Sequence, residues 1–81
     1  MIGYVFNANT TCDGGLYSLD GSKANSLKLT IAHCNNNKDC SMVMLNNCDE
    51  SDPKYFYCIN GSPKTSQTAC SWAKKESVND L

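Results

Sequence analysis

Six cysteines in a chain of 81 residues constrain this protein more than any other feature of its sequence. A domain of this size hides only about 60% of the surface that its unfolded chain exposes. Leu, Ile, Val and Phe number 14 of 81, which is less than the roughly 20% expected of a chain that folds by burial alone. The net charge of −1, however, is too small for a disordered chain. We therefore expect one domain, residues 1–81, stabilised by disulfides at about 2 to 4 kcal/mol each.

Disulfides also indicate a cellular compartment. They form and persist outside the reducing cytosol, so the cysteine content predicts a secreted, extracellular protein. The opening residues 1–4 have neither the basic segment nor the apolar run of a signal peptide, and we interpret the chain as a mature form. No segment approaches the roughly 20 apolar residues that span a bilayer, so we expect no membrane span.

The two closest cysteines lie in "HCNNNKDC", residues 33–40. Structural zinc sites present C-x2-4-C pairs and redox centres present C-x-x-C, whereas this pair is C-x5-C and the other gaps are 21, 7, 9 and 11 residues. We therefore predict no metal and no cofactor, and Cys34 and Cys40 as the two ends of a tethered loop. All six cysteines are expected in disulfides, with fifteen pairings open: Cys12, Cys34, Cys40, Cys48, Cys58 and Cys70.

Catalytic patterns are sparse. His33 is the only histidine, and although Asp39 could orient it, no nucleophile or oxyanion hole is indicated beside it. The chain has no G-x-S-x-G elbow, no phosphate-binding glycine loop and no H-E-x-x-H. All seven basic residues are lysines, which argues against a nucleic-acid or phosphate ligand. We predict that the protein is not an enzyme, and that the acidic run at 49–52 is a solvated loop.

Turn signals separate five short apolar segments, at 4–6, 16–19, 27–33, 42–45 and 55–59. Most have the length of strands. The segment 27–33 alternates apolar and polar residues as a half-buried strand does, and we favour that interpretation. A helix is the alternative, through Ala24, Leu27, Ile31 and Cys34.

The last third of the chain has the pattern of a helix. Ser62 can cap it and Pro63 suits its first position. Ala69, Trp72 and Ala73 would then share one helical face. The fold class predicted is α+β, a small disulfide-stapled antiparallel β-sheet with a C-terminal helix.

Aromatic residues are the candidates for binding. In a strand, Tyr55 and Tyr57 lie on one face while Phe56 and Cys58 lie on the other. Tyrosines displayed outward, together with Trp72, would form a surface for a protein partner or a glycan. The alternative is that the two tyrosines only cover the helix that carries Trp72. "NTT" and "NGS" make Asn9 and Asn60 candidate N-glycosylation sites.

The stretch "YFYCINGSPKTSQTACSWAKK" places one cysteine on a strand and a second on the expected helix, where it could be tied back to the strand. This arrangement resembles small secreted killer toxins of fungi and the plant-pathogen effectors built on the same scaffold. Six cysteines with a C-x5-C pair also resemble invertebrate chitin-binding modules. Both resemblances imply a secreted, non-catalytic protein that acts by binding.

The function expected is therefore that of a secreted effector or toxin-like protein that binds a host or competitor protein. A disulfide-rich scaffold can keep a binding surface rigid without a large core. A carbohydrate (chitin)-binding module and a secreted pheromone or signalling protein are the alternatives.

Overall fold

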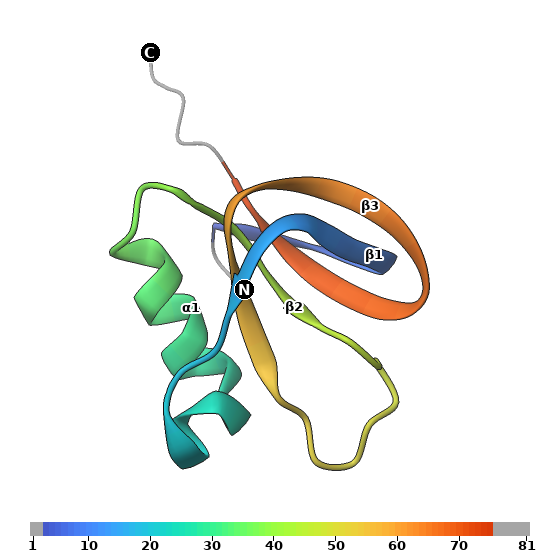
Figure 1. Cartoon of the computed structure of the whole chain (residues 1–81), viewed down its shortest axis with the longest axis horizontal. Helices are drawn as coiled ribbons and strands as arrows, with labels where there is room; N and C mark the ends of the chain where they lie inside the picture. The colour runs from blue at the N-terminus through green and yellow to red at the C-terminus, as the bar shows by residue number, and fades with distance from the viewer. Residues whose placement is uncertain (1–2, 76–81) are drawn as a thin grey trace.

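The computed structural model describes residues 3–75. Part of the opening stretch 1–4, which was considered above as the place of a signal peptide, lies outside the described residues. The elements, in chain order, are β1 (Tyr4–Tyr17), the 3-10 helix η1 (Gly21–Asn25), α1 (Leu27–Asn35), β2 (Cys40–Leu45) and β3 (Tyr55–Lys74). The strands form one sheet in the order β1-β3-β2, and α1 lies beside it (Figure 1). The prediction of a small antiparallel sheet with one helix and disulfides is confirmed, but the predicted C-terminal helix is wrong.

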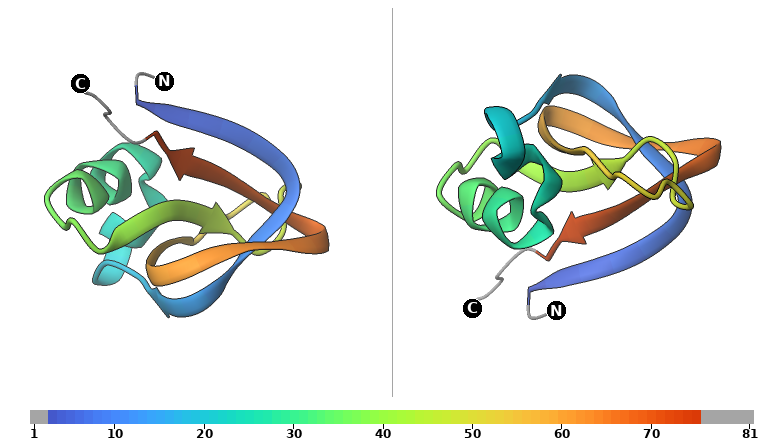
Figure 2. Two further views of the ribbon diagram at one scale, coloured as in Figure 1. Left: turned by 90° about the horizontal axis from the view of Figure 1, so that it is seen from above. Right: turned by 90° about the horizontal axis from the view of Figure 1, so that it is seen from below.

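Strand β2 lies between the two ends of β3. Val43 is opposite Tyr57 on one side and opposite Trp72 on the other. Strand β1 runs antiparallel along the whole of β3, with Tyr4 opposite Lys74 at one end and Tyr17 opposite Tyr57 at the other. The β1/β3 ribbon therefore wraps around β2, as Figures 1 and 2 show, and both edges of the sheet are formed by opposite ends of β1.

The ribbon bends at two shifts of register. The first follows the pair of Ala8 and Cys70, and the second follows the pair of Asp13 and Ser62. Bulges of this kind increase local twist and turn a strand out of its plane. Asn9 (φ 56°) and Asn60 (φ 53°) lie at these shifts in the left-handed region, which asparagine tolerates better than most residues.

The segment predicted as a C-terminal helix is the second half of β3. Its capping residues are compatible with either structure, because Pro63 lies opposite Cys12 in a stretch where β3 has a neighbour on one side only. Proline is tolerated in a strand at such places. Within residues 65–68, Thr65 pairs with Thr10, whereas Ser66 and Thr68 lie at the register shift. There the Ser66 Oγ accepts from Ala69 N at 3.2 Å and the Thr68 Oγ1 donates to the Asn46 carbonyl oxygen at 3.0 Å.

The segment 27–33 is helical, so the strand interpretation is wrong and its alternative is correct. Ser26 caps α1, accepting a hydrogen bond on its side chain from the Leu29 backbone N at 3.1 Å. Ile31 and Cys34 are buried on one helical face, whereas Leu29, which a strand would bury, is 46% exposed. The i, i+3, i+4 spacing of apolar residues therefore predicts this segment better than its alternation of apolar and polar residues does, because one face of the helix packs against the sheet.

Strand β2 is buried on both faces, as its unbroken apolar run "MVML" requires. On one face Val43 packs with Tyr4, Ile31, Cys34 and Cys40, a group that we call the helix-side core. On the other face Met42 and Met44 pack inside the curved ribbon with Cys12, Cys58 and Ala69, which we call the ribbon-side core.

A bulge at Ser41 connects the sheet to residues 34–40, which we call the asparagine loop because of its three consecutive asparagines. Cys40 is opposite Ile59 and Met42 is opposite Cys58, so two residues of β2 span one step of β3. The extra residue turns Cys40 to the same side as Val43, where it bonds to Cys34. The interpretation of residues 34–40 as a tethered loop is confirmed.

All six cysteines form disulfides, as predicted, in the pairs Cys12–Cys58, Cys34–Cys40 and Cys48–Cys70. The bridge between Cys58 and Cys70 that the killer-toxin resemblance depends on is not formed. Strand β2 lies between these two residues, with Met42 opposite Cys58 and Leu45 opposite Cys70. That resemblance therefore supports no further argument about the fold.

Candidate functional site

A row of side chains crosses the helix side of the sheet. Residues that are directly opposite one another share a face, and the register aligns Tyr17, Tyr57, Val43, Trp72 and Phe6 in this order. Val43, in the middle, is fully buried in the helix-side core, and each flank of the row is aromatic. We call Tyr17, Tyr57 and the neighbouring His33 the tyrosine cluster, and Phe6, Trp72 and Tyr55 the tryptophan cluster.

Tyr57 is the centre of the tyrosine cluster. Its ring centroid lies 4.4 Å from that of His33 and 5.8 Å from that of Tyr17, whose plane is inclined to it by only 30°. Tyr57 also packs against the helix-side core, and this packing fixes the position of its ring. Tyr17 is 53% exposed and His33 is exposed. The cluster thus presents two accessible rings on a fixed support.

Trp72 is the centre of the tryptophan cluster. Its ring lies 5.3 Å from Phe6 at 58° and 6.0 Å from Tyr55 at 62°, between centroids. Trp72 and Tyr55 are half-buried against the helix-side core, whereas Phe6 is 52% exposed. The exposed apolar surface of this cluster is therefore mainly that of Phe6, at the edge of the sheet.

The three residues chosen from the sequence, Tyr55, Tyr57 and Trp72, are brought to one side of the sheet. All three are half-buried, because each also covers the helix-side core. The exposed members, Phe6, Tyr17 and His33, were not proposed as binding residues. Their positions in apolar segments could be recognised, but the register that stacks them on Trp72 and Tyr57 could not.

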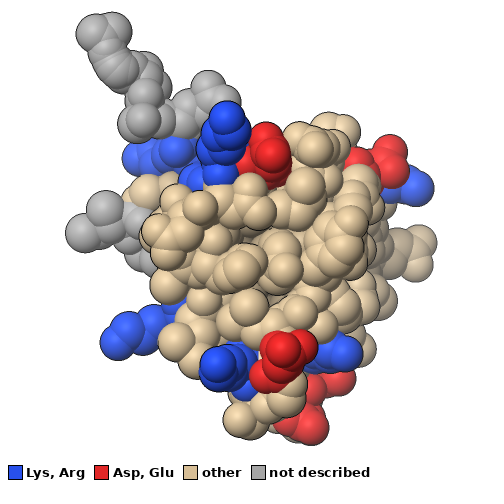
Figure 3. All heavy atoms as spheres, turned by 60° about the vertical axis from the view of Figure 1, so that its left-hand side comes forward, with Lys and Arg blue, Asp and Glu red and all other residues tan. Residues whose placement is uncertain are grey.

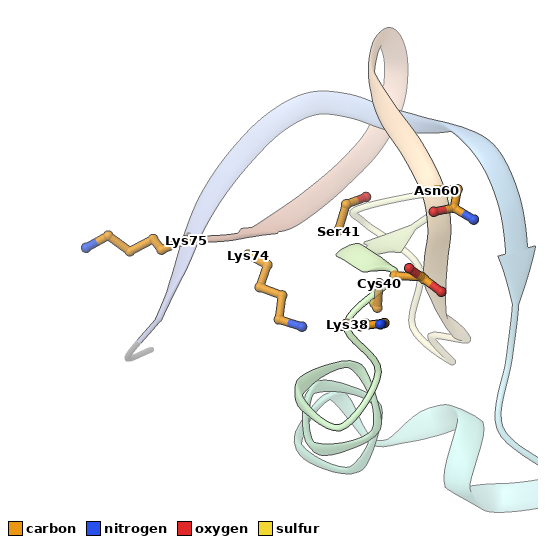
Figure 4. A pocket seen from close by; sticks show the side chains of 7 residues that line it. Lys38, Cys40, Ser41, Asn60, Lys74 and Lys75 are labelled. Carbon is orange, nitrogen blue, oxygen red and sulfur yellow. The ribbon is translucent and has the colours of Figure 1, made fainter. Parts of the chain in front are cut away.

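His33 and Asp39 have different partners in the structure. The His33 ring packs on Tyr57 and forms no hydrogen bond with Asp39, whose backbone N donates to Asn37 Oδ1 at 3.0 Å. Asp39 instead lines a cavity of about 540 Å³ at the end of α1, together with Lys38, Cys40, Ser41, Asn60, Lys74 and Lys75 (Figure 4).

One lysine of this cavity serves the fold. Lys74 Nζ donates to the carbonyl oxygens of Cys34 at 2.8 Å and Asn37 at 3.2 Å. Both carbonyls also accept a backbone N–H, so the ammonium adds a second hydrogen bond to each, and a cation in this place interacts favourably with the helix dipole. Lys75 points away from the cavity in Figure 4. The ammonium best placed to meet an anion is thus already bound.

Tyr4 fastens the same helix end. Its phenol donates a hydrogen bond to Asn35 Oδ1 at 2.7 Å, and its side chain belongs to the helix-side core. Burial raises the pKa of Tyr4 above its usual value of 10.0, because the phenolate would lose its hydration. Tyr4 is therefore a neutral hydrogen-bond donor at physiological pH.

The remaining sequence candidates lie apart from the aromatic clusters. The acidic run 49–52 is exposed in a loop fastened by Cys48–Cys70 and by Asn25, whose Nδ2 donates to the Pro53 carbonyl oxygen at 2.6 Å. Asn9 and Asn60 are exposed, although Asn9 Nδ2 donates to the Gln67 carbonyl oxygen at 3.1 Å. Glycosylation at these two residues stays a prediction.

Charge is distributed unevenly over the surface. On the side where α1 comes forward, Figure 3 shows a broad area without charged side chains, with lysines and acidic residues gathered above and below it. Within residues 3–75, no three His, Cys, Asp or Glu side chains are grouped as metal ligands would be. The accessible chemistry of this side is therefore aromatic and neutral polar.

Comparison with known proteins gives no relative from which a function could be transferred. No family model matches the chain, and neither the curated proteins nor the solved structures include a significant match. None of the helices in the described part of the chain has the length and apolar character needed to cross a membrane.

Proposed function

We propose that this chain is a secreted, non-catalytic binding protein of the effector or toxin type, which engages a host or competitor protein through the tyrosine cluster. The observation that carries the proposal is that Tyr17 is 53% exposed while its ring is stacked on Tyr57. An exposed ring that is already immobilised loses little conformational entropy on binding. Tyrosine and tryptophan are enriched among the residues that dominate protein interfaces.

The scaffold beneath the cluster supports this function. Tyr57 is attached to β3 next to Cys58, whose disulfide reaches Cys12, and His33 is next to Cys34, whose disulfide reaches Cys40. Two of the three ring-bearing positions are thus adjacent to covalent cross-links. Such a surface keeps its shape in the oxidising, proteolytic medium outside cells.

A protein partner is favoured over a glycan by the ring geometry. Sugar rings stack best on aromatic faces that lie flat and coplanar on a surface. Around Trp72 the planes are inclined by 58° and 62°, and Tyr17 and Tyr57 are stacked on one another. Neither cluster therefore forms one flat platform of coplanar rings, whereas single tyrosine rings are common anchors between proteins.

Tyr17→Ala tests the proposal, with Val5→Ala as the matched control because Val5 is an exposed apolar residue at the opposite end of β1 from Tyr17. Purified, fluorescently labelled protein is titrated onto intact host and competitor cells and onto chitin beads. We expect saturable, protease-sensitive binding to cells that Tyr17→Ala weakens at least about tenfold and Val5→Ala preserves, as for loss of an interface hot spot. Equal binding by the Tyr17 variant, or retention on chitin that exceeds binding to cells, would overturn it.

A further inference from the structure

Among residues 3–75, the N-terminal end of β1 has a neighbouring strand on one side only and so forms an edge of the sheet. Strand β1 pairs with β3 on one side, and Figure 2 shows it on the outside of the molecule. The Gly3 carbonyl oxygen accepts a hydrogen bond from Lys75 N at 2.8 Å, so Gly3 is directed toward β3. By the alternation of an antiparallel ladder, the backbone N–H and C=O groups of Tyr4, Phe6 and Ala8 are directed outward.

This edge has one of the features that limit strand addition and lacks the others. Edge strands are normally blocked by lysine, proline, inward-pointing charge or a β-bulge. Here a shift of register follows Ala8, so the regular edge ends at that residue. Residues 3–12 contain no charged residue and no proline. Val5 and Phe6 are 46% and 52% exposed, and they are adjacent on the strand. The edge therefore offers outward backbone groups and apolar surface, although the Ala8 carbonyl oxygen already accepts one hydrogen bond, from Thr10 Oγ1 at 3.0 Å.

We propose that a second copy of this chain pairs antiparallel with this edge, about a two-fold axis at Phe6. In this register Phe6 pairs with Phe6 of the second copy, and Tyr4 pairs with Ala8 of the second copy. Every outward backbone group of these three residues then has a partner. A register centred on Val5 would instead place Phe6 opposite Tyr4, so the two exposed Phe6 rings would not meet. A two-fold contact requires such a self-complementary edge.

Side chains and charge favour this occupant. Directly opposite residues share a face, so the two exposed Phe6 rings would meet on the helix side, each already supported by its own Trp72. Tyr4 is fully engaged in the helix-side core and would face only the small Ala8. Because residues 3–12 carry no charge, pairing the edge with itself opposes no like charges.

The dimer leaves the tyrosine cluster accessible, because Tyr17 lies at the opposite end of β1 and so at the other edge of the sheet. Two copies would present two tyrosine clusters on one continuous sheet. Such an arrangement raises the avidity for a partner with repeated sites. The inference does not depend on the proposed function, since self-association is measured without any partner.

Sedimentation velocity over a concentration series up to about 1 mM, the weak limit of specific association, tests the dimer. We expect the wild-type chain to show a concentration-dependent dimer. Phe6→Lys and Phe6→Glu each place like charges opposite one another and should raise the dissociation constant at least about tenfold. An equimolar mixture of the two variants should restore the dimer. Val5→Lys is the control, because it adds charge at an exposed neighbour that is not self-opposed.

Thermal unfolding and the absence of free thiols establish that each variant is folded before it is compared. A wild-type chain that stays monomeric throughout the series overturns the inference. So does a Phe6→Lys variant that dimerises as the wild type does, or a mixture of folded Phe6→Lys and Phe6→Glu that stays monomeric. Dimerisation that Val5→Lys abolishes as fully as Phe6→Lys would overturn the register.

Discussion

The two cores on either side of β2 are closed in different ways. The helix-side core is built largely from neighbouring segments, because α1 is followed directly by β2 and Cys34–Cys40 joins them across six positions. The ribbon-side core brings β1 onto β3, and its disulfide, Cys12–Cys58, spans 46 positions. The buried residues of the helix-side core thus come from residues 31–43 apart from Tyr4, whereas those of the ribbon-side core come from distant parts of the chain.

Their side chains differ as well. The helix-side core is bordered by tyrosines and Trp72, which stack on one another and continue to the surface. The ribbon-side core contains Met42, Met44 and the Cys12–Cys58 sulfurs, with Phe56 at its margin. Methionine fills irregular space without fixing one shape. The comparison teaches that the face with rigid, directional packing is also the face that displays the candidate binding residues.

Removing the long-range disulfide should have the largest effect. The chain-entropy relation gives about 4 kcal/mol for the loop that Cys12–Cys58 closes and about 2 kcal/mol for the loop that Cys34–Cys40 closes. We expect Cys12→Ala/Cys58→Ala to lower the free energy of unfolding about twice as much as Cys34→Ala/Cys40→Ala, by guanidinium titration. Equal losses would mean that the two cores do not differ in their dependence on distant contacts.

Gly61 should be the next most sensitive position on the ribbon side. A methyl group there would collide with both sulfurs of Cys12–Cys58. We expect Gly61→Ala to cost about 3 kcal/mol, as for severe overpacking, or to prevent the disulfide. Gly21→Ala is the control, since Gly21 has φ 56° but no neighbour within 4 Å, and should cost about 1 kcal/mol. Denaturant titration and thiol counting measure both, and a Gly61 variant as stable as the control would contradict this account.

The helix-side core should show its own dependence on pH, through Tyr4. Because burial raises the folded-state pKa of Tyr4 above 10.0, its contribution is complete below pH 10.0 and is lost as the pH rises through the folded value. We expect Tyr4→Phe to cost about 1 kcal/mol at neutral pH, from the lost bond to Asn35. The same variant should lose less stability than the wild type above pH 10.0. Parallel alkaline curves would remove Tyr4 as the cause.

The smallest effect is expected at Ser71, which is fully buried on β3 opposite Met44. Its Oγ has no hydrogen-bond partner among the residues that the structure describes. Since an unpaired buried hydroxyl costs free energy, Ser71→Ala should leave stability unchanged or raise it by up to about 1 kcal/mol. Thr30→Val is the contrasting variant on the helix side, because Thr30 Oγ1 donates to the Ser26 carbonyl oxygen at 2.9 Å. If Ser71→Ala proved the more destabilising of the two, the hydroxyl must have a partner.

Local sequence patterns were enough for part of this fold. The cysteine content predicted a disulfide-stabilised domain, the asparagine loop predicted the tether from Cys34 to Cys40, and short apolar segments predicted strands at 42–45 and 55–59. These features depend on residues a few positions apart, whose spacing in the chain largely decides their spacing in space.

Tertiary structure alone decided the rest. Ser62 and Pro63 are compatible with a helix start or a strand corner, and only the pairing of β3 with β1 selects the strand. The partners of Cys12 and Cys70, and the row that stacks Tyr17 on Tyr57 and Phe6 on Trp72, depend on register between segments 22 to 66 positions apart. Register is set by the total burial and hydrogen bonding of the whole sheet, which no short stretch of sequence contains.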